Sequence, residues 1–307
     1  MSPRSRDIAE RLVAVYNGAM AIVWLGSSAR APHAKWLVLA HTAAAALPWL
    51  YRACPRPTAP IRLLHELYPL LLLAGFWTEL DVLHGTLGGP SSLAVPQLDL
   101  ALFGTHLHEI WLPAMKGAWF SEPMYFMYFL YYPLIYLPLL VMVIRGRRDA
   151  VRDMTLRLMV TFLVCYSVYV LLPVNGPQLL LAPPEGPYQQ GLFYRLVAMA
   201  QQSGSALGCA FPSSHVAGAV TIAVLAWRWF PRWIGVVLSL EALGVFLATT
   251  YTQNHYAVDS IAGLLLGLGL QLVVVPALLR LRRTAAPFVA LPVAPVTGEY
   301  PAGGGVP

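Results

Sequence analysis

The feature that most constrains this chain is a series of long apolar blocks separated by short polar segments. A helix rises 1.5 Å per residue, so blocks of about 17 to 21 residues can cross the roughly 30 Å hydrocarbon layer of a membrane. A composition of 58% hydrophobic and 11% charged residues also excludes an ordinary soluble domain. The blocks predict about eight transmembrane spans, at 8–28, 36–51, 64–80, 124–144, 156–172, 212–230, 233–250 and 258–279.

Two of these spans allow a second interpretation. The first is followed by Ala-Arg-Ala at 29–31, which resembles a signal-peptide cleavage site, but we expect the span to be retained. The second is short, so it could be tilted or interfacial.

The basic residues predict the orientation of the chain, because cytoplasmic loops collect lysine and arginine. They gather at the N-terminus and after the second, fourth, sixth and eighth spans, whereas the opposite side has Arg30, Lys35, Lys116 and Arg195. Both termini are therefore expected in the cytoplasm. The net charge of +6 follows from this topology and requires no nucleic-acid partner.

The same pattern divides the chain into three parts. We expect N-terminal membrane helices at 1–80, a catalytic membrane domain at 81–283 and a disordered cytoplasmic tail at 284–307, which is rich in Pro, Gly and Ala. The long loop 81–123 mixes apolar and polar residues around position 100, so it is expected to contain a helix lying on the membrane surface.

A first polar cluster occupies 208–215, at the predicted outer start of the sixth span. Pro212 suits the first turn of a helix, where its missing N–H costs nothing. The N–H groups of Ser213, Ser214 and His215 would then be free at a positive helix end, which favours an anion. A plain helix cap with an interfacial histidine is the alternative interpretation.

A second polar cluster occupies 252–259, at the outer start of the eighth span. His255 and Asp259 are four residues apart, which predicts that they share one helix face, with the carboxylate holding one imidazole nitrogen. A nucleophilic or basic histidine is oriented in this way. The alternative is a simple polar contact, but the predicted topology brings both clusters to the same membrane face.

The motifs resemble those of the type 2 phosphatidic-acid phosphatase superfamily: Phe-Pro-Ser-Ser-His at 211–215 is followed by Asn-His-Tyr-Ala-Val-Asp at 254–259. The His-Tyr-x-x-Asp form is most similar to the inositol phosphorylceramide synthase branch, and weaker similarity covers 98–279. The resemblance implies an all-α, polytopic membrane helical bundle with a phosphatidic-acid phosphatase/haloperoxidase-like core. It also implies that His255 forms a phosphohistidine, that Asp259 orients it and that His215 protonates the leaving oxygen.

Two departures from the family pattern concern phosphate binding. The family's phosphatases have the pattern Lys-x-x-x-x-x-x-Arg-Pro, but no lysine precedes Pro173 or Pro177 at that spacing, and Asn-Gly-Pro-Gln at 175–178 lacks the arginine. They also have an arginine six residues before the nucleophile, where this chain has Thr249. A phosphodiester carries one negative charge and a monoester nearly two, so the loss of cations favours a diester. Neutral donors to it are expected from Ser213, Ser214, Asn175, Gln178 and Asn254.

Other polar residues have competing interpretations. His106, His108 and Glu109 have a spacing that metal ligands can have, but no further set completes a shell, so neither a metal nor another cofactor is predicted. Glu79 and Asp81 are interpreted as solvated or headgroup-binding residues, and the tyrosines of 125–136 as interfacial anchors. Lys116 and Arg195 are candidates to replace a missing phosphate ligand.

Together these features predict an enzyme: a membrane phosphotransferase that moves a phosphorylated headgroup from a lipid phosphodiester to an alcohol, with its site on the non-cytoplasmic face. A lipid phosphate phosphatase is the first alternative. A transporter or scaffold is the second, although the paired interrupted helices typical of transporters are not evident. The expected partner is a membrane lipid, and the oligomeric state stays open.

Overall fold

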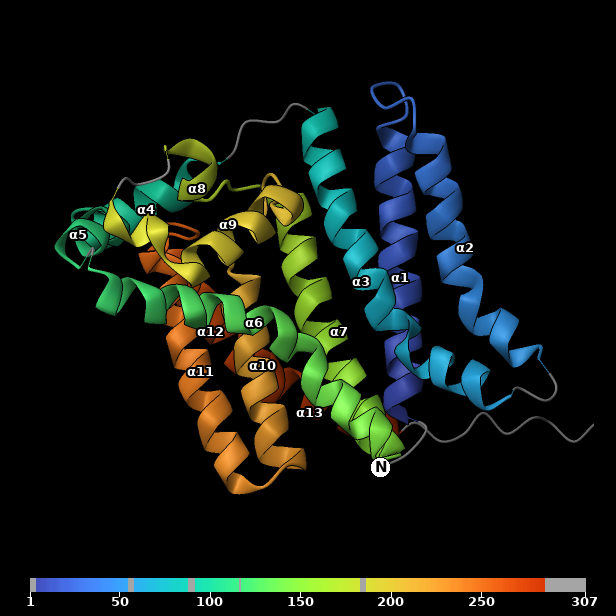
Figure 1. Ribbon diagram of the computed structural model, residues 1–307. Coiled ribbons are helices and arrows are strands. Elements are labelled where there is room, and N and C mark those ends of the chain that lie inside the picture. The colour runs from blue at the N-terminus through green and yellow to red at the C-terminus, as the bar shows by residue number, and fades with distance from the viewer. Residues whose placement is uncertain (1–3, 55–57, 88–91, 116, 183–185, 285–307) are drawn as a thin grey trace, which may run out of the picture.

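The chain forms a bundle of helices in the computed structural model, which describes residues 4–54, 58–87, 92–115, 117–182 and 186–284 (Figure 1). The helices of the first half are α1 (Arg4–Gly26), α2 (Ala34–Arg52), α3 (Ala59–Leu87), α4 (Ala94–Phe103), α5 (Leu107–Ala114) and α6 (Ala118–Ile144). Those of the second half are α7 (Arg148–Leu171), α8 (Pro177–Leu180), η1 (Pro187–Gln190), α9 (Leu192–Gly204), α10 (Ser214–Trp229), α11 (Arg232–Tyr251), α12 (Ala257–Gly269), the π-helical η2 (Leu270–Val274) and α13 (Val275–Thr284).

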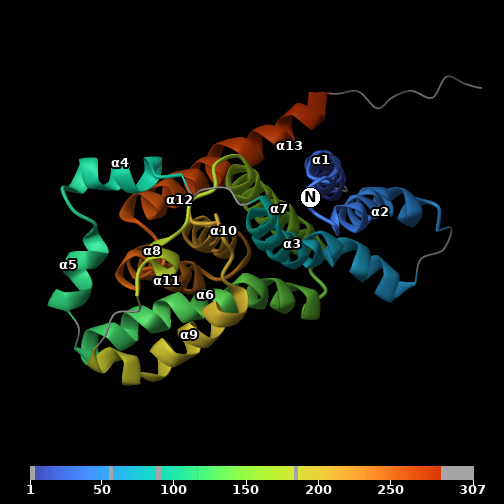
Figure 2. The same cartoon turned by 90° about the horizontal axis from the view of Figure 1, so that it is seen from above.

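Helix α10 lies at the centre of the second half (Figure 2). It packs against α6, α7, α11 and α12, and its residues from Val216 to Ala223 are all buried. Helices α1 and α3 pack on the other side of α7, and α2 packs on α1. Helix α7 therefore joins the N-terminal helices to the bundle around α10.

Six helices in the described residues are long and apolar enough to cross a membrane: α1, α3, α6, α7, α11 and the continuous helix Ala257–Leu281. Helix α2 lies where the second span was predicted but is less apolar, and α10, at 16 residues, is shorter than a usual span. The predicted all-α membrane fold is confirmed, whereas the number of eight spans stays a prediction.

The boundaries of the long outer loop were predicted too wide. Helix α3 continues to Leu87 and α6 begins at Ala118, so Pro123 lies inside a helix, as membrane helices tolerate. A helix, α4, is present where the surface helix was expected, and α5 follows it; the position of α4 at the membrane surface stays a prediction. The proposed division between residues 80 and 81 falls within α3, and the predicted tail lies outside the described residues beyond Thr284.

The acidic residues near the C-terminal end of α3 form hydrogen bonds within the protein. Glu79 is buried and accepts hydrogen bonds from the Trp24 indole and from His41, whose Nε2 is 2.6 Å from Oε1. Asp81 accepts from the Leu207 N–H at 2.9 Å. The interpretation of Glu79 as solvated or headgroup-binding was wrong, because its carboxylate is buried with protein partners, whereas partly exposed Asp81 can still contact solvent.

Candidate active site

The first motif folds as a cap on α10. Ser213 is the N-cap, and its hydroxyl accepts a hydrogen bond from the Val216 N–H at 3.4 Å. Serine suits this position because its oxygen satisfies an N–H that the helix leaves open. Pro212 therefore lies just before the cap, and the expectation that it occupies the first turn was wrong.

Two of the three amides expected to be free already have partners. The Ser213 N–H donates to the Asp259 carbonyl at 3.0 Å, and the Ser214 N–H donates to the Tyr169 hydroxyl at 3.1 Å. These bonds connect the start of α10 to α12 and α7. The His215 N–H is the remaining candidate of the three, so the predicted anion site at this helix end is smaller than expected.

The second motif forms the turn between α11 and α12. His255 precedes α12, and the Asp259 carboxylate reaches back from the third helical position, with Oδ2 3.4 Å from His255 Nδ1. The same oxygen accepts the Tyr256 N–H at 2.9 Å. The pair is therefore brought together by the cap of α12. The expectation that both residues lie on one helix face was wrong, because His255 lies before the helix begins.

The backbone of this turn is fixed at both ends. The N–H groups of Asn254 and His255 donate to the Thr249 carbonyl at 3.1 and 3.0 Å. The Thr249 side chain is fully buried and its hydroxyl lies 2.9 Å from that of Ser260. Thr249 thus fills the place of the family's arginine with a neutral contact between α11 and α12.

The two histidines face each other across this junction. Their ring centroids are 5.6 Å apart, and both side chains are largely buried. His215 Nε2 lies 3.2 Å from the Tyr128 hydroxyl, and the rings of Tyr131 and Tyr132 pack around it. Buried Tyr128 and Tyr131 therefore line the site, so their interpretation as interfacial anchors was wrong.

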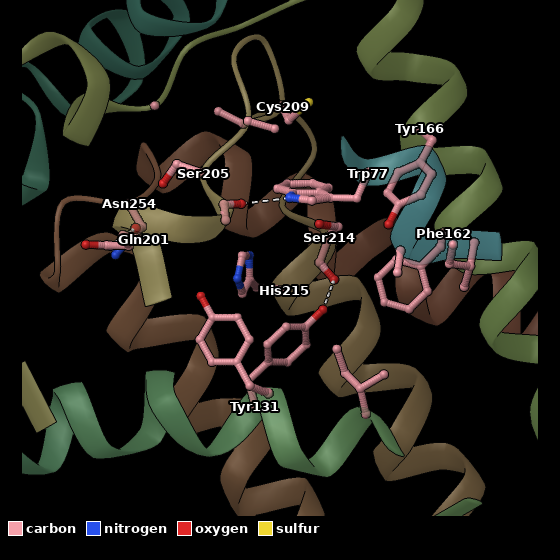
Figure 3. Close-up of a pocket in the computed structure, with 18 of the residues that line it drawn as sticks. Trp77, Tyr131, Phe162, Tyr166, Gln201, Ser205, Cys209, Ser214, His215 and Asn254 are labelled. Carbon is pink, nitrogen blue, oxygen red and sulfur yellow. Dashed lines mark hydrogen bonds between the residues drawn. The ribbon is translucent and has the colours of Figure 1, made fainter. Parts of the chain in front are cut away.

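Both histidines line a cavity of about 360 Å³. Figure 3 shows this cavity around His215. Of the predicted substrate-binding residues, Ser214, Gln178 and Asn254 line it. Ser213 does not line it but caps α10 behind it. Lysine and arginine are absent from the described residues that line this cavity.

Three amide side chains order the polar end of the cavity. Gln201 of α9, which was not predicted from the sequence, donates a hydrogen bond to Asn254 Oδ1. The side-chain nitrogen of Asn254 in turn donates to Thr252 Oγ1 at 2.7 Å. With its nitrogen facing the turn, Gln178 donates to the Gln253 and Asn254 carbonyls at 3.2 and 2.6 Å. The amphipathic α9 was hidden in a long loop, which is why Gln201 was not found.

Asn175 has a different role from the one expected. Its Oδ1 accepts the Gly208 N–H at 2.8 Å, next to a short parallel bridge between Val174 and Cys209. These bonds hold the segment after α7 against the segment before α10. Asn175 is not among the residues that line the cavity.

A second polar pair supports the turn from outside the cavity. Asp99 of α4 is fully buried; its Oδ1 accepts the Val258 N–H at 3.0 Å, and Oδ2 lies 2.8 Å from His106 Nδ1. The His106 ring stacks on that of His108. This cluster fixes the start of α12, and within the described residues no group of three or more His, Cys, Asp or Glu could hold a metal ion.

Of the remaining cation candidates, Arg195 is not among the residues that line the cavity. Arg195 is exposed on α9, and Lys116 lies outside the described residues. Burial lowers the pKa of His255 to about 4, with a backbone contact to Ala210 acting in the opposite direction. His255 is therefore neutral at neutral pH, the form in which an imidazole can act as a nucleophile.

The fold and this site define a helical membrane protein with two facing histidines, one of them paired with a carboxylate. The family model of the PAP2 superfamily, a sequence profile, matches residues 94–273, which is more than half of the chain. The chain therefore belongs to that superfamily. Comparison with curated proteins and with solved structures gave no match. Members of the superfamily are generally phosphatases or phosphotransferases, so the chain is an integral membrane enzyme of phosphoester chemistry.

Proposed function

We propose that the enzyme transfers a phosphorylated headgroup from a lipid phosphodiester to an alcohol through a phosphohistidine intermediate. The observation that carries the proposal is a cavity that contains two facing histidines and, among the described lining residues, no lysine or arginine. A doubly charged monoester placed there would lose its hydration without a charged partner. A singly charged diester needs fewer donors, and the inositol phosphorylceramide synthase-like form of the His255 motif supports the same choice.

In the first step, His255 Nε2 attacks the phosphorus while the bond from phosphorus to the lipid oxygen breaks. With the phosphate anion bound beside it, His215 takes up a proton and then gives this proton to the departing oxygen, as a general acid. Asp259, next to Nδ1, holds the imidazole in the tautomer whose other nitrogen is free to attack. The headgroup phosphate is then attached to His255 by a P–N bond.

In the second step, an alcohol gives its proton to the now neutral His215 and its oxygen attacks the phosphorus. The P–N bond breaks, which restores both histidines. Water in place of the alcohol would make the same site a phosphatase. The buried position of His255 supports transfer, because a site with little water protects a reactive intermediate from hydrolysis.

We further propose that the site opens to the non-cytoplasmic face. The α6–α7 and α10–α11 turns carry Arg145, Arg147 and Arg232 at the end of the bundle away from the histidines (Figure 1). Basic residues collect in cytoplasmic loops, so the opposite end, with the starts of α10 and α12, is the external one.

A direct assay distinguishes transfer from hydrolysis. The purified enzyme is given headgroup-labelled phosphatidylinositol, with and without ceramide or diacylglycerol, and in parallel phosphatidic acid as a monoester. We expect the label to move to the lipid alcohol and phosphatidic acid to react slowly. Release of headgroup phosphate at one rate with or without an alcohol, or a preference for phosphatidic acid, would identify a phosphatase.

A further inference from the structure

The cavity extends from the histidines into an apolar groove between α3, α6 and α7 (Figure 3). Its polar end is formed by residues of α9, α10 and the turn before α12. Its other end is lined by Leu73 of α3, Ile135 of α6 and Phe162 of α7. All three of these helices are long and apolar enough to span a membrane, so the groove lies at the depth of the hydrocarbon layer.

The groove is deep enough for much of a hydrocarbon chain. On α7 the lining residues run from Tyr166, near the polar end, to Leu158 at the apolar end. At 1.5 Å per residue, these positions are about 12 Å apart along α7. This is more than a third of the roughly 30 Å thickness of the hydrocarbon layer.

The groove is open on the side that faces the membrane. Ala74 and Thr78 on α3 line the groove and are exposed, and on α6 the lining residue Tyr136 is 54% exposed. Exposed faces of membrane-spanning helices contact lipid chains rather than water. A lipid in the bilayer can therefore place a chain between α3 and α6 while its headgroup reaches the histidines.

Trp77 fixes the α3 wall close to the polar end. Its indole N–H donates to the Gly204 carbonyl at the end of α9 at 2.7 Å, and its ring lies 6.0 Å from that of Tyr166. Figure 3 shows the Trp77 ring between the loop that carries Cys209 and the side chains of α7. Helix α3 lies outside the matched residues 94–273, so this wall comes from the N-terminal helices rather than from the matched domain.

We propose that α3 is the element that selects the donor lipid by its hydrocarbon chain, with the chain lying across Ala74 and below Trp77. The proposal rests on the proposed function and adds to it the class of donor: a lipid whose chain enters the groove from the bilayer. The continuity of the groove with the histidines, its apolar lining and its lateral opening all favour a substrate chain as the occupant.

The test fills the groove at Ala74, an exposed residue that lines it. Ala74→Trp should lower kcat/KM for dipalmitoyl phosphatidylinositol relative to dibutanoyl phosphatidylinositol by about tenfold or more, a loss typical of blocked hydrophobic subsites. Ala74→Leu should give an intermediate ratio. Leu71→Trp is the matched control, because Leu71 is on the same helix, is 62% exposed and does not line the groove. An unchanged ratio in Ala74→Trp would overturn the proposal.

A second readout needs no turnover, so it separates this proposal from the proposed function. Vesicles containing a phospholipid with a photoreactive acyl chain should label α3 peptides in the wild type and in Leu71→Trp, and label them several-fold less in Ala74→Trp. Loss of labelling would support the groove even if phosphatidylinositol were not a substrate. Equal labelling in all three proteins would overturn the proposal. If Ala74→Trp transfers the headgroup with an unchanged ratio of kcat/KM between the dipalmitoyl and dibutanoyl substrates, the proposal also fails, but the proposed function stands.

Discussion

At the scale of single residues, the site depends on a neutral imidazole placed beside a buried carboxylate. His255 is 4% exposed and Asp259 is fully buried, and His255 Nδ1 lies 3.4 Å from Asp259 Oδ2. Tyr128 contacts the second histidine at 3.2 Å and limits how its ring can turn. These side chains come from three separate helices and one turn, so their positions depend on packing.

The pH dependence of kcat/KM follows from the lowered pKa of His255. Protonation removes the nucleophile, and with a pKa of about 4 this loss begins only below about pH 5. We expect kcat/KM for an activated aryl phosphodiester to be flat from about pH 5 to neutrality, whereas an ordinary histidine would lose activity below its usual pKa of about 6.5.

The control for this experiment is His215→Asn, assayed with the same activated ester, whose leaving group needs no proton. The acid limb should be the same in this variant, because it belongs to His255. An acid limb near pH 6.5, or one that disappears in His215→Asn, would contradict the assignment.

The sequence predicted the identity of the central residues better than their surroundings. His215, His255 and Asp259 come together as expected because each lies in or beside a helix start with a clear polar signature. The free amides were not predicted correctly, since their partners, such as Tyr169, lie far away in the sequence. Tyr128 was misassigned because tyrosines that line a site and tyrosines that anchor a helix give the same local pattern.

At the scale of elements, the contact between α10 and α12 sets the distance between the two histidines. Glycine allows the two helices to approach closely: a Cβ added at Gly263 would lie 2.4 Å from the Ser213 carbonyl oxygen and 3.2 Å from the Val216 Cβ. A Cβ at Gly267 would also meet α10, at 3.0 Å from the Val220 Cβ.

Gly263→Ala should therefore separate α12 from α10. We expect destabilisation of about 1–3 kcal/mol, the usual cost of overpacking, and a loss of turnover larger than the loss of folded protein. Thermal unfolding in detergent and kcat measured on the same samples check both effects.

Gly269→Ala is the control on the same helix, because a Cβ there would meet nothing within 4 Å. It should be neutral or slightly stabilising, since alanine favours a helix over glycine by about 1 kcal/mol. Equal behaviour of the two variants would show that the close contact does not position the site.

Element boundaries were predictable only where apolar composition defined them. The central parts of α3, α6, α7 and α11 were found, but their ends were not, because polar residues such as Asp81 lie within helices when the protein supplies partners. The amphipathic α9 was missed because its 13 residues are too few for a membrane span and lie within a long loop between two spans.

At the scale of the whole molecule, the two ends of the bundle differ in charge. The turns that carry Arg145, Arg147 and Arg232 lie at one end, and both histidine motifs lie at the other. The N-terminal helices complete the cavity through α3, a contribution that no sequence motif in these helices indicated. This contribution is non-local, because α3 and the histidines are far apart in the chain.

The orientation in the membrane can be measured with cysteines added to a Cys54→Ser background, in which the two remaining cysteines, Cys165 and Cys209, are buried. Gln190→Cys, in exposed η1, should react with an impermeant maleimide added to intact cells, and Pro231→Cys, in the exposed α10–α11 turn, should react only after the membrane is opened. The reverse pattern would place the active site on the cytoplasmic face.

The central claim is that His255 carries the phosphoryl group. Wild-type enzyme, mixed with headgroup-labelled phosphatidylinositol without an acceptor and quenched in alkali, should yield one labelled peptide, the one containing His255. Asp259→Asn should accumulate this label more slowly, and His255→Ala should neither take up label nor retain turnover above about 10⁻² of the wild-type rate. Label on another residue, or a His255→Ala enzyme that still transfers the headgroup at the wild-type rate, would contradict the account.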